Sequence, residues 1–477
     1  MSGDTEKFLR LPGGGVGFAL GVEYRKEKAF SDFDDFTQSG ATFFNAIQAF
    51  DPPSQEIKEA FGEVRVPLVA GERFFQELTI EASGRASDYG GRIGTQYACN
   101  VSGVYSPVRD LRLRAGYARS VRAPNLSNLF ASRSDTFANG FVDPCNQTVI
   151  NTNPNRVRNC AAAGIPTTIV VNGQTRPFIN TSGSGLLGFN AGNSDLVPEV
   201  GTSLTIGGVF QPSFLPGFSL TVDYYDIKVK KVIQGLNGQT IIDLCYDDPG
   251  GIDNQFCNVI FRRRSDNPLI DFTFNGQASR TFVGADTVPL PRLGPSFLNT
   301  PFNFAALKTS GIDFDAAYRR KVFGDVDLNL RAVVSWVKNR ETFSSITEPD
   351  RSTQLAGTLG DPKWEGTFNA RVDFGKFDFG YAMQYIGKQT IGAFATQFSN
   401  QGRPPENADA FPTRYYPEVF YHDVRVAFQP TKRFEFYIGI DNITDRYPPF
   451  GLDATGAGGG IFSNTGRFFY SGAKITL

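Results

Sequence analysis

The chain has 477 residues, with 47 lysines and arginines against 48 aspartates and glutamates and one histidine, so its formal charge is -1. This balance excludes a partner recognised by bulk charge, such as nucleic acid or an anionic membrane surface. Hydrophobic residues make up 40% and occur only in short runs, which excludes an α-helical membrane span. The 51 glycines and 13% aromatic residues favour one large all-β structure over the roughly three ordinary domains that the length suggests.

Apolar and polar residues alternate along many segments, which is the pattern of a half-exposed β-strand. Residues 218–224, for example, read Phe-Ser-Leu-Thr-Val-Asp-Tyr. In chain order the pattern predicts fourteen strands, near residues 14–29, 58–69, 73–87, 95–107, 110–121, 200–212, 217–232, 299–321, 325–341, 361–374, 377–391, 417–429, 432–443 and 466–477.

A soluble β-sandwich produces the same alternation, but three further features favour a membrane barrel. The predicted strands have about 9 to 15 residues, whereas strands of soluble proteins usually have ~5–6 and ~9–11 tilted residues cross a bilayer. The polar positions carry full charges, and aromatic residues gather at strand ends, as in an interfacial girdle. Connections alternate between tight turns, such as 375–376, and long loops, such as 122–199 and 233–298. We therefore predict an all-β fold, a transmembrane antiparallel β-barrel with short periplasmic turns and long extracellular loops.

Several motifs occur in a characteristic order along the chain. They are Arg-Ala-Pro at 122–124, Leu-Val-Pro-Glu at 196–199, Gly-Ile-Asp-Phe at 311–314 and the segment 441–449. Together these segments resemble the TonB-dependent receptors, the 22-stranded active transporters of Gram-negative outer membranes. Asn128, where an acidic residue is common, and Leu477, where the family usually ends in Phe, depart from the pattern.

The resemblance implies that the fourteen strands are the last of the 22, so residues 1–477 would be the C-terminal part of one barrel domain, without a plug domain or signal peptide. It also implies the partners: a lipid bilayer with lipopolysaccharide, a small ligand that is an iron chelate or an oligosaccharide, and a plug domain and TonB in the intact receptor. We expect a monomer in the Gram-negative outer membrane, with no nucleic-acid partner.

Charges of both signs occupy the inward positions of the predicted wall. They are expected either to pair with one another in a hydrated lumen or, by the resemblance, to contact a plug. The predicted lumen-facing or plug-facing residues are Glu77, Glu81, Arg112, Arg114, Asp223, Asp313, Asp327, Arg331, Arg371, Asp373, Arg425 and Glu435.

Four of the five cysteines form two close pairs in the two longest loops, Cys145 with Cys160 and Cys245 with Cys257. No histidine or CxxC motif accompanies them, so we expect no metal site, and an oxidising compartment favours disulfides that restrict the loops. Cys99 has the parity of a lipid-facing residue. His422 is expected at the rim rather than in a catalytic triad, because the adjacent Asp423 faces the other side of a strand. We predict no enzyme activity and no cofactor.

Ligand contacts are expected on the long loops. Arg403, Arg414, Tyr415 and Tyr416 place cations beside aromatic rings, which suits either a sugar or an anionic iron chelate. Three functions stay open: an uptake receptor, of which this chain is a working part or a truncated remnant; a passive outer-membrane pore; and a soluble extracellular β-rich binding module.

Overall fold

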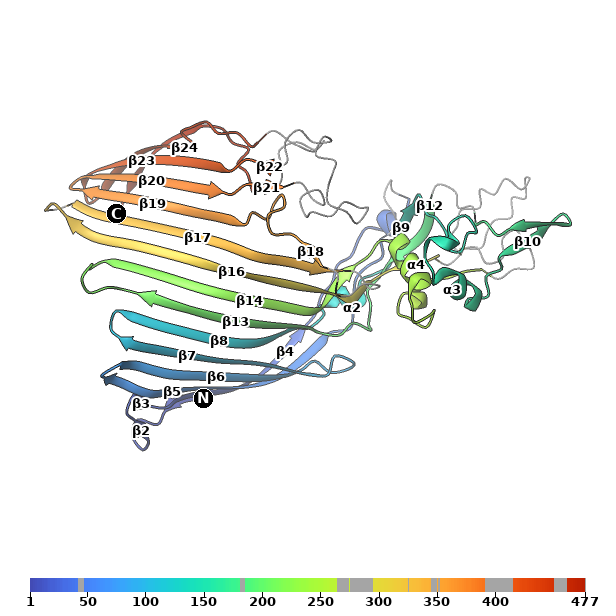
Figure 1. The fold of residues 1–477 in the computed structure, drawn as a ribbon, viewed down its shortest axis with the longest axis horizontal. Helices are drawn as coiled ribbons and strands as arrows, with labels where there is room; N and C mark the ends of the chain where they lie inside the picture. The colour runs from blue at the N-terminus through green and yellow to red at the C-terminus, as the bar shows by residue number, and fades with distance from the viewer. Residues whose placement is uncertain are drawn as a thin grey trace.

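The computed structural model of the protein describes residues 1–41, 47–180, 185–263, 274, 295–324, 326–344, 350, 352–390, 415–449 and 461–476. Its main feature is a 16-stranded sheet in which the long strands follow one another in chain order. Figure 1 shows this sheet as a curved wall, with two of the long loop connections gathered beyond one end of its strands. The predicted all-β antiparallel barrel architecture is confirmed.

The fourteen predicted strands all form, with ends shifted by a few residues. They are β4 (Gly17–Glu27), β5 (Gln55–Glu72), β6 (Phe75–Asp88), β7 (Thr95–Val108), β8 (Leu111–Arg122), β13 (Glu199–Phe210), β14 (Phe218–Gly235), β16 (Pro301–Val322), β17 (Val326–Phe343), β19 (Trp364–Phe374), β20 (Phe377–Ile386), β23 (Val419–Thr431), β24 (Phe434–Asp441) and β25 (Phe468–Ile475). The sheet also includes β1 (Ser2–Asp4), paired with β4, and β18 (Thr353–Gln354), paired with β17. Both are too short to show alternation, so the sequence did not predict them.

Register sorts the side chains of the sheet onto two chemically different faces. Between β19 and β20, Phe368 pairs with Met383 and Val372 with Phe379, and the alternating positions in between include Arg371. We call the side of Phe368 the apolar face and the side of Arg371 the polar face. Large apolar residues on the apolar face are open to the surroundings, for example Val22, which is 86% exposed. A water-soluble protein rarely leaves so extended an apolar surface uncovered, whereas a bilayer covers it.

The connections at one end of the strands are short, and two of them are tight turns. Glu72 pairs with Phe75, and Phe374 pairs with Phe377, so each of these two turns has two residues. Phe74 has φ 63° and Gly375 has φ 60°, the positive values that such turns demand. This end is the short-turn rim, and the opposite end is the loop rim.

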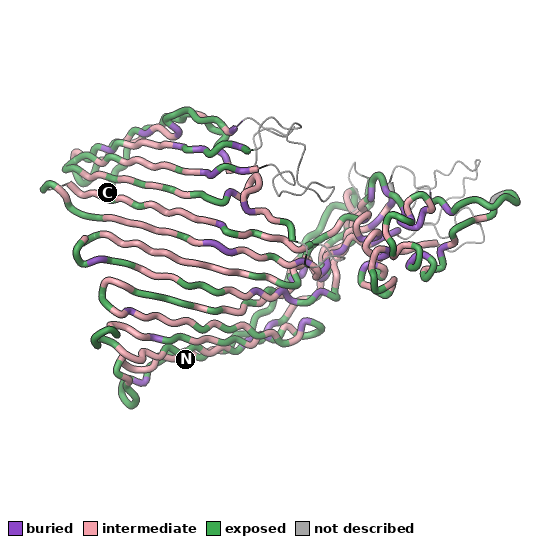
Figure 2. Tube along the Cα trace, viewed as in Figure 1, coloured by how far each residue is buried: buried purple, intermediate pink, exposed green. Residues whose placement is uncertain are grey.

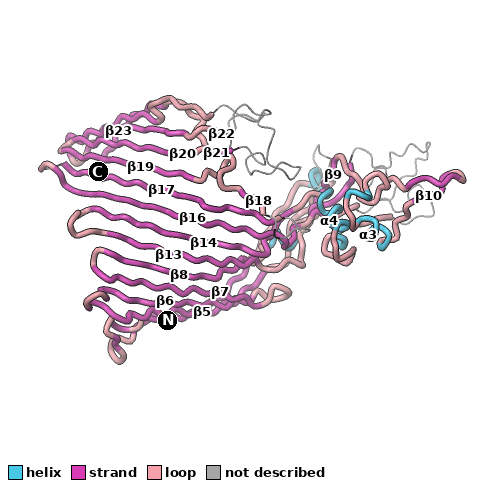
Figure 3. Tube along the Cα trace, in the orientation of Figure 1, coloured by secondary structure: helices cyan, strands magenta, loops and turns pink. Residues whose placement is uncertain are grey.

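The connections β8–β13 and β14–β16 fold together into a loop lobe at the loop rim (Figures 1 and 3). Its elements are α2 (Leu126–Phe130), β9 (Ser134–Asn139), η1 (Ile150–Thr152), α3 (Arg156–Ala162), β10 (Thr168–Val171), β11 (Gln174–Pro177), β12 (Gly185–Asn190), α4 (Gly238–Asp247), η2 (Cys257–Val259) and β15 (Leu298–Asn299). Strand β12 pairs antiparallel with β9 and parallel with β15, so one small sheet joins both connections. The sequence predicted loops here and did not predict this lobe.

The loop lobe has a hydrophobic core of its own, which includes Leu186, Ile241, Ile242, Phe256 and Phe297. Figure 2 shows buried residues gathered in the lobe and where the strands meet it, while most of the sheet is intermediate or exposed. This contrast is expected if lipid, rather than protein, covers the sheet.

The remaining elements are short: α1 (Asp35–Gln38), β2 (Arg10–Leu11), β3 (Gly14–Gly15), β21 (Gln389–Thr390) and β22 (Tyr415–Tyr416). Within the described residues, β1 and β25 are the two ends of the sheet path. None of the helices in the described part of the chain has the length and apolar character needed to cross a membrane.

Candidate functional site: polar wall, loop lobe and rim cavity

The polar face carries a series of ion pairs, most of which join side chains of different strands. Seven basic residues each meet an acidic partner on this wall: Arg112 with Glu77 (3.4 Å), Arg65 with Glu81 (3.1 Å), Arg114 with Asp223 (2.9 Å), Arg331 with Asp315 (2.8 Å), Arg371 with Asp373 (3.2 Å), Arg425 with Glu435 (2.7 Å) and Lys321 with Asp327 (4.0 Å). Asp313 lies directly across from Asp223 in the register. The structure therefore places all twelve predicted wall residues on one face of the sheet.

The wall pairs are partly exposed, so each adds little to stability. What they provide is a hydrated surface of mixed charge. The Arg114–Asp223 pair also requires a glycine between its two residues, because Gly207 lies between Arg114 and Asp223 in the register. A Cβ atom at Gly207 would overlap the Asp223 carboxylate, so the close pair needs glycine at this position.

Sequence reasoning missed two carboxylates that parity would have found. Glu59 faces the wall side with its side chain only 4% exposed, contacts Arg85 at 3.3 Å and accepts a short hydrogen bond from Ser87. Glu199 accepts a 2.7 Å bond from Arg122 Nε and another of 2.7 Å from the backbone N–H of Ile233. Glu199 and Arg122 belong to the two proline motifs of the sequence, and the fold brings those motifs together at the base of the loop lobe.

The motif at residues 441–449 closes the loop between β24 and β25. The Asn442 backbone N–H donates to Asp423 at 2.7 Å, and its side chain donates to the Arg446 carbonyl at 2.8 Å. Asn442 has φ 51°, a left-handed conformation that asparagine tolerates better than most residues. Asp445 accepts from the backbone N–H of Arg467 at 2.7 Å, which fixes the chain that leads into the last strand.

The loop lobe is built around a buried ion pair. Asp143 is fully buried and accepts 2.7 Å bonds from Arg262 Nη1 and Nη2, a 2.8 Å bond from Asn180 and a 2.9 Å bond from the Cys145 backbone N–H. Burial alone would lower the pKa of Arg262, but the Asp143 carboxylate and the Tyr246 hydroxyl raise it above its usual value. Arg262 therefore stays charged, and its guanidinium lies 4.0 Å from the centre of the Phe274 ring.

Both expected cysteine pairs are disulfides in the loop lobe, Cys145–Cys160 and Cys245–Cys257. The Cys145 bridge begins two residues from Asp143, so the covalent and ionic contacts hold the same segment. Cys99 is a free, exposed thiol. Among the described residues there is no group of three or more His, Cys, Asp or Glu side chains that could hold a metal ion.

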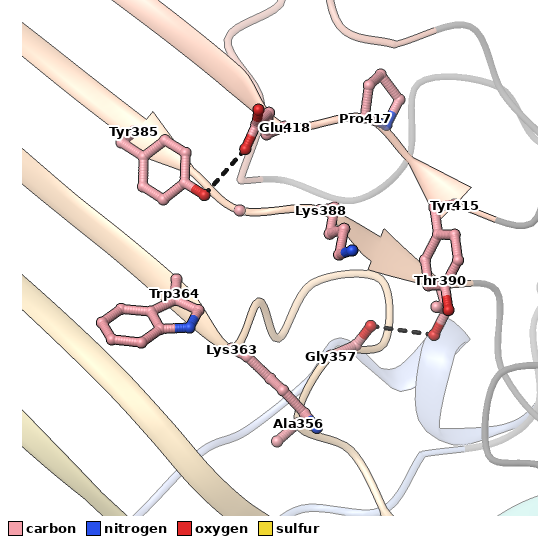
Figure 4. A pocket seen from close by; sticks show the side chains of 11 residues that line it. Ala356, Gly357, Lys363, Trp364, Tyr385, Lys388, Thr390, Tyr415, Pro417 and Glu418 are labelled. Carbon is pink, nitrogen blue, oxygen red and sulfur yellow. Dashed lines mark hydrogen bonds between the residues drawn. The ribbon is translucent and has the colours of Figure 1, made fainter.

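Of the four loop residues expected to contact a ligand, Arg403 and Arg414 lie outside the described residues. Tyr416 is completely buried, whereas Tyr415 is 42% exposed. Tyr415 lines a cavity of about 740 Å³ at the loop rim, together with Trp364, Tyr385 and two lysines, Lys363 and Lys388 (Figure 4). We call it the rim cavity.

The rim cavity lies on the apolar side of the wall. Register places Trp364 beside Trp336 and Tyr385 beside Phe420, all on the apolar face. In the β21–β22 pair, Thr390 and Tyr415 face the cavity, and Gln389 and Tyr416 share the opposite, buried side. A second cavity, of about 430 Å³, lies on the polar face. The polar-face cavity is lined by Gln384, Tyr421, Asp423, Asp441, Asn442, Ser463, Thr465, Gly466 and Phe468.

His422, expected at the rim near the aromatic girdle, is the fourth residue of β23 and lies on the apolar face. Its Nδ1 lies 2.7 Å from the Tyr381 hydroxyl, and its ring stacks on Tyr381 and Phe420. A hydrogen-bonded, stacked ring of this kind fits an aromatic girdle. Asp423 faces the polar side, as the strand geometry requires.

Comparison with known proteins identifies the family. Residues 1–443 match the family model described as TonB dependent receptor-like, beta-barrel. No curated protein matches the sequence. A mutant of the ferric enterobactin receptor of Pseudomonas aeruginosa superimposes with a TM-score of 0.57 at 12% identity, over 97% of this chain and 51% of that chain. The siderophore receptor PirA of Acinetobacter baumannii gives a TM-score of 0.56 at 12% identity, over 100% of this chain and 53% of that chain.

The chain thus spans about half the length of these solved receptors, and the similarity at such low identity concerns the fold. The family match, by contrast, covers most of the sequence and agrees with the ion-paired wall, the apolar face and the two unequal rims. This chain belongs to the TonB-dependent receptors, in their β-barrel domain.

Proposed function

We propose that this chain forms the C-terminal barrel wall, residues 1–477, of an outer-membrane receptor that takes up a scarce ligand such as an iron–siderophore complex or an oligosaccharide. One observation carries the proposal: a continuous wall of mixed charges on one face of the sheet and an uncovered apolar face on the other. Such a wall separates lipid from a hydrated interior. The plug domain and TonB would act on it from outside this chain.

The loop lobe and the neighbouring loop-rim segments are the proposed ligand-binding region. Two disulfides and a buried ion pair make the lobe rigid, which lowers the ordering cost of binding. Arg403 and Arg414 are proposed as the cationic contacts to an anionic chelate. Tyr416, being buried, is proposed to support the loop instead of touching the ligand.

The wall residues are proposed to contact the plug through water-accessible polar groups. Side chains such as Arg371 and Arg331, 59% and 58% exposed, keep part of their hydrogen-bonding capacity free of their wall partners. Partly hydrated pairs exchange partners at low cost, which suits a plug that must move. In this proposal the protein acts as a monomer and carries out no covalent chemistry.

The test is ligand binding by the full chain, refolded in detergent and titrated calorimetrically with ferric catecholate, ferric hydroxamate and neutral oligosaccharides. We expect saturable binding of one class, weakened about tenfold or more in an Arg403→Ala/Arg414→Ala variant. The matched control is Arg92→Ala, which removes another loop-rim arginine, one that pairs with the exposed Asp195.

Planar-bilayer recording distinguishes the alternatives. Steady ohmic conductance with no saturable ligand binding would favour a passive pore and refute the receptor proposal. A chain that fails to insert would favour a remnant. A chain that stays folded in water without detergent would favour the soluble binding module and exclude both membrane functions.

A further inference from the structure

The rim cavity lies where a membrane lipid, and not an imported ligand, would meet the protein. Trp364 and Tyr385 project from the apolar face, on the opposite side from the wall residue Arg371. A ligand that enters the barrel contacts the polar face and the inner side of the loops. Molecules that reach the rim cavity come from the outer surface of the barrel.

Strand length fixes the depth of the cavity in the bilayer. Strand β19 runs for 11 residues from Trp364 at the loop rim to Phe374 at the short-turn rim. Ten steps of about 3.3 Å, tilted by about 40°, give a height of about 25 Å, which is the height of the apolar band in outer-membrane barrels. Aromatic pairs mark both edges of this band: Trp336–Trp364 at 5.9 Å and Phe377–Phe428 at 4.9 Å. The rim cavity therefore lies at the level of the outer-leaflet headgroups.

Charge at the cavity favours an anion. Lys363 and Lys388 line it, and within the described residues neither ammonium group forms an ion pair. Glu418 is the only acid among the described lining residues, and it accepts a 3.2 Å hydrogen bond from the Tyr385 hydroxyl. The described lining thus carries two positive charges against one negative charge.

The two lysines are positioned by the cavity wall. Lys388 Nζ lies 5.2 Å from the centre of the Tyr415 ring. Lys363 passes over Gly357, where an added Cβ would come within 3.3 Å of its Cε and where φ is +93°. Glycine at this position lets the lysine lie flat against the loop.

We propose that the rim cavity binds the phosphate group of an anionic, phosphate-bearing lipid of the outer leaflet. Lys363 and Lys388 would contact the phosphate, and Trp364, Tyr385 and Tyr415 would contact the adjoining sugar or glycerol and the start of the acyl chains. A cavity of about 740 Å³ is large enough for such a headgroup. The inference rests on the membrane orientation in the proposed function and adds a lipid-binding site to it.

The protein carries a built-in reporter for this site, because Trp364 lines the cavity and the second tryptophan, Trp336, has its ring centre 5.9 Å from that of Trp364. The full chain in nonionic detergent micelles is titrated with a phosphorylated glycolipid, with the same lipid after removal of its phosphates, and with a zwitterionic phospholipid, while tryptophan fluorescence is recorded. We expect a saturable change with the phosphorylated lipid that inorganic phosphate at high concentration reduces.

Variants test the roles of the charges. Lys363→Gln/Lys388→Gln should weaken binding of the phosphorylated lipid roughly 30-fold, because each lysine near a lipid surface contributes about fivefold to the affinity. Lys376→Gln, a lysine of the short-turn rim, is the matched control and should leave binding unchanged. Glu418→Gln should tighten binding several-fold, because it removes the opposing charge.

Equal affinity for the phosphorylated and dephosphorylated lipids, or unchanged binding in the double lysine variant, would overturn the site. A fluorescence change caused by inorganic phosphate, with none caused by the phosphorylated lipid, would also overturn it, since it would indicate a site for a free anion. Insertion is measured separately, by quenching of tryptophan with brominated lipids in vesicles. Absence of quenching there would refute the membrane orientation of the proposed function, while the micelle titration still reports on the phosphate site itself.

Discussion

Removal of the Asp143 carboxylate should destabilise the loop lobe while leaving the sheet intact. Asp143 is fully buried and binds Arg262 through two 2.7 Å bonds, and the Arg262 side chain is itself only 11% exposed. In Asp143→Ala the guanidinium keeps the Tyr246 hydroxyl at 2.8 Å but loses the two bonds to the Asp143 carboxylate. Removing one partner of a buried ion pair typically costs about 3–5 kcal/mol.

Hydrogen exchange measures this cost locally. Amides of β9 and β12 should exchange through opening of the loop lobe, so their opening free energy should fall by about 3–5 kcal/mol in Asp143→Ala, while amides of the long strands β16 and β17 keep theirs. The matched control is Asp195→Asn, which breaks an ion pair with Arg92 whose side chains are 67% and 72% exposed. That change should cost less than about 1 kcal/mol.

A double replacement separates the ionic contribution from simple loss of packing. Asp143→Leu/Arg262→Met removes both charges together and should recover most of the loss, as apolar replacements of buried ion pairs usually do. A change below about 1 kcal/mol in Asp143→Ala would refute the reasoning, and so would a double variant as unstable as the single one.

Three further predictions concern the wall and the loop lobe. Gly207→Ala should displace Asp223 and lower the midpoint of denaturant unfolding, with Gly84→Ala, where an added Cβ meets no atom within 4 Å, as the control. Replacing Cys245 by serine removes the disulfide to Cys257, which closes a loop of 12 positions, and should lower the stability of the lobe by about 3 kcal/mol because the unfolded chain gains entropy. Limited proteolysis measures this loss. Burial raises the pKa of Asp243 in the folded protein. Its protonated carboxyl therefore stabilises the lobe fully below the unfolded pKa of ~4, and this stabilisation is lost as the pH rises through the higher folded pKa. In Asp243→Asn the lobe stability measured by hydrogen exchange should depend less on pH across that window.

The strands of the sheet were predictable because each strand carries its own alternating pattern of apolar and polar residues. Each strand alternates with period two, and burial against lipid on one side and water on the other repeats that signal at every position. Parity therefore assigned residues such as Arg114 and Asp223 to one face, although they are 109 positions apart in the chain. The same rule would have found Glu59, which lies opposite Ser87 across the β5–β6 pair and contacts Arg85, two residues earlier in β6, at 3.3 Å.

The loop lobe was not predictable because its contacts are long-range. Leu186 and Phe297 meet in one core although they come from different connections, and the pairing of β12 with β15 is parallel and two residues long. No periodic pattern marks such a segment. The cysteine pairs were visible only because each bridges 15 or 12 positions within one connection.

The ligand residues show where a compositional argument reaches its limit. Adjacent tyrosines beside cations suggested a ligand contact, but in the β21–β22 pair Tyr415 and Tyr416 face opposite ways. Tyr416 is buried, and Tyr415 faces the outside of the barrel with Lys388. The sequence analysis named one residue of the rim cavity, Tyr415, but only the register showed which surface carries it.

Glu199 explains how the loop lobe and the wall form one structure. It is the first residue of β13, pairs with Arg122 at the end of β8 and accepts the backbone N–H of Ile233 near the end of β14. One carboxylate thus joins three of the four strand ends that the two lobe connections link. Because the β12–β15 pair joins the two connections within the lobe, the lobe is held together as one unit. A ligand that moves the lobe therefore affects the wall only through the contacts of Glu199 or through the strands themselves. The lobe is therefore expected to transmit ligand binding to the wall as a rigid body, through the loop-rim ends of β8, β13 and β14.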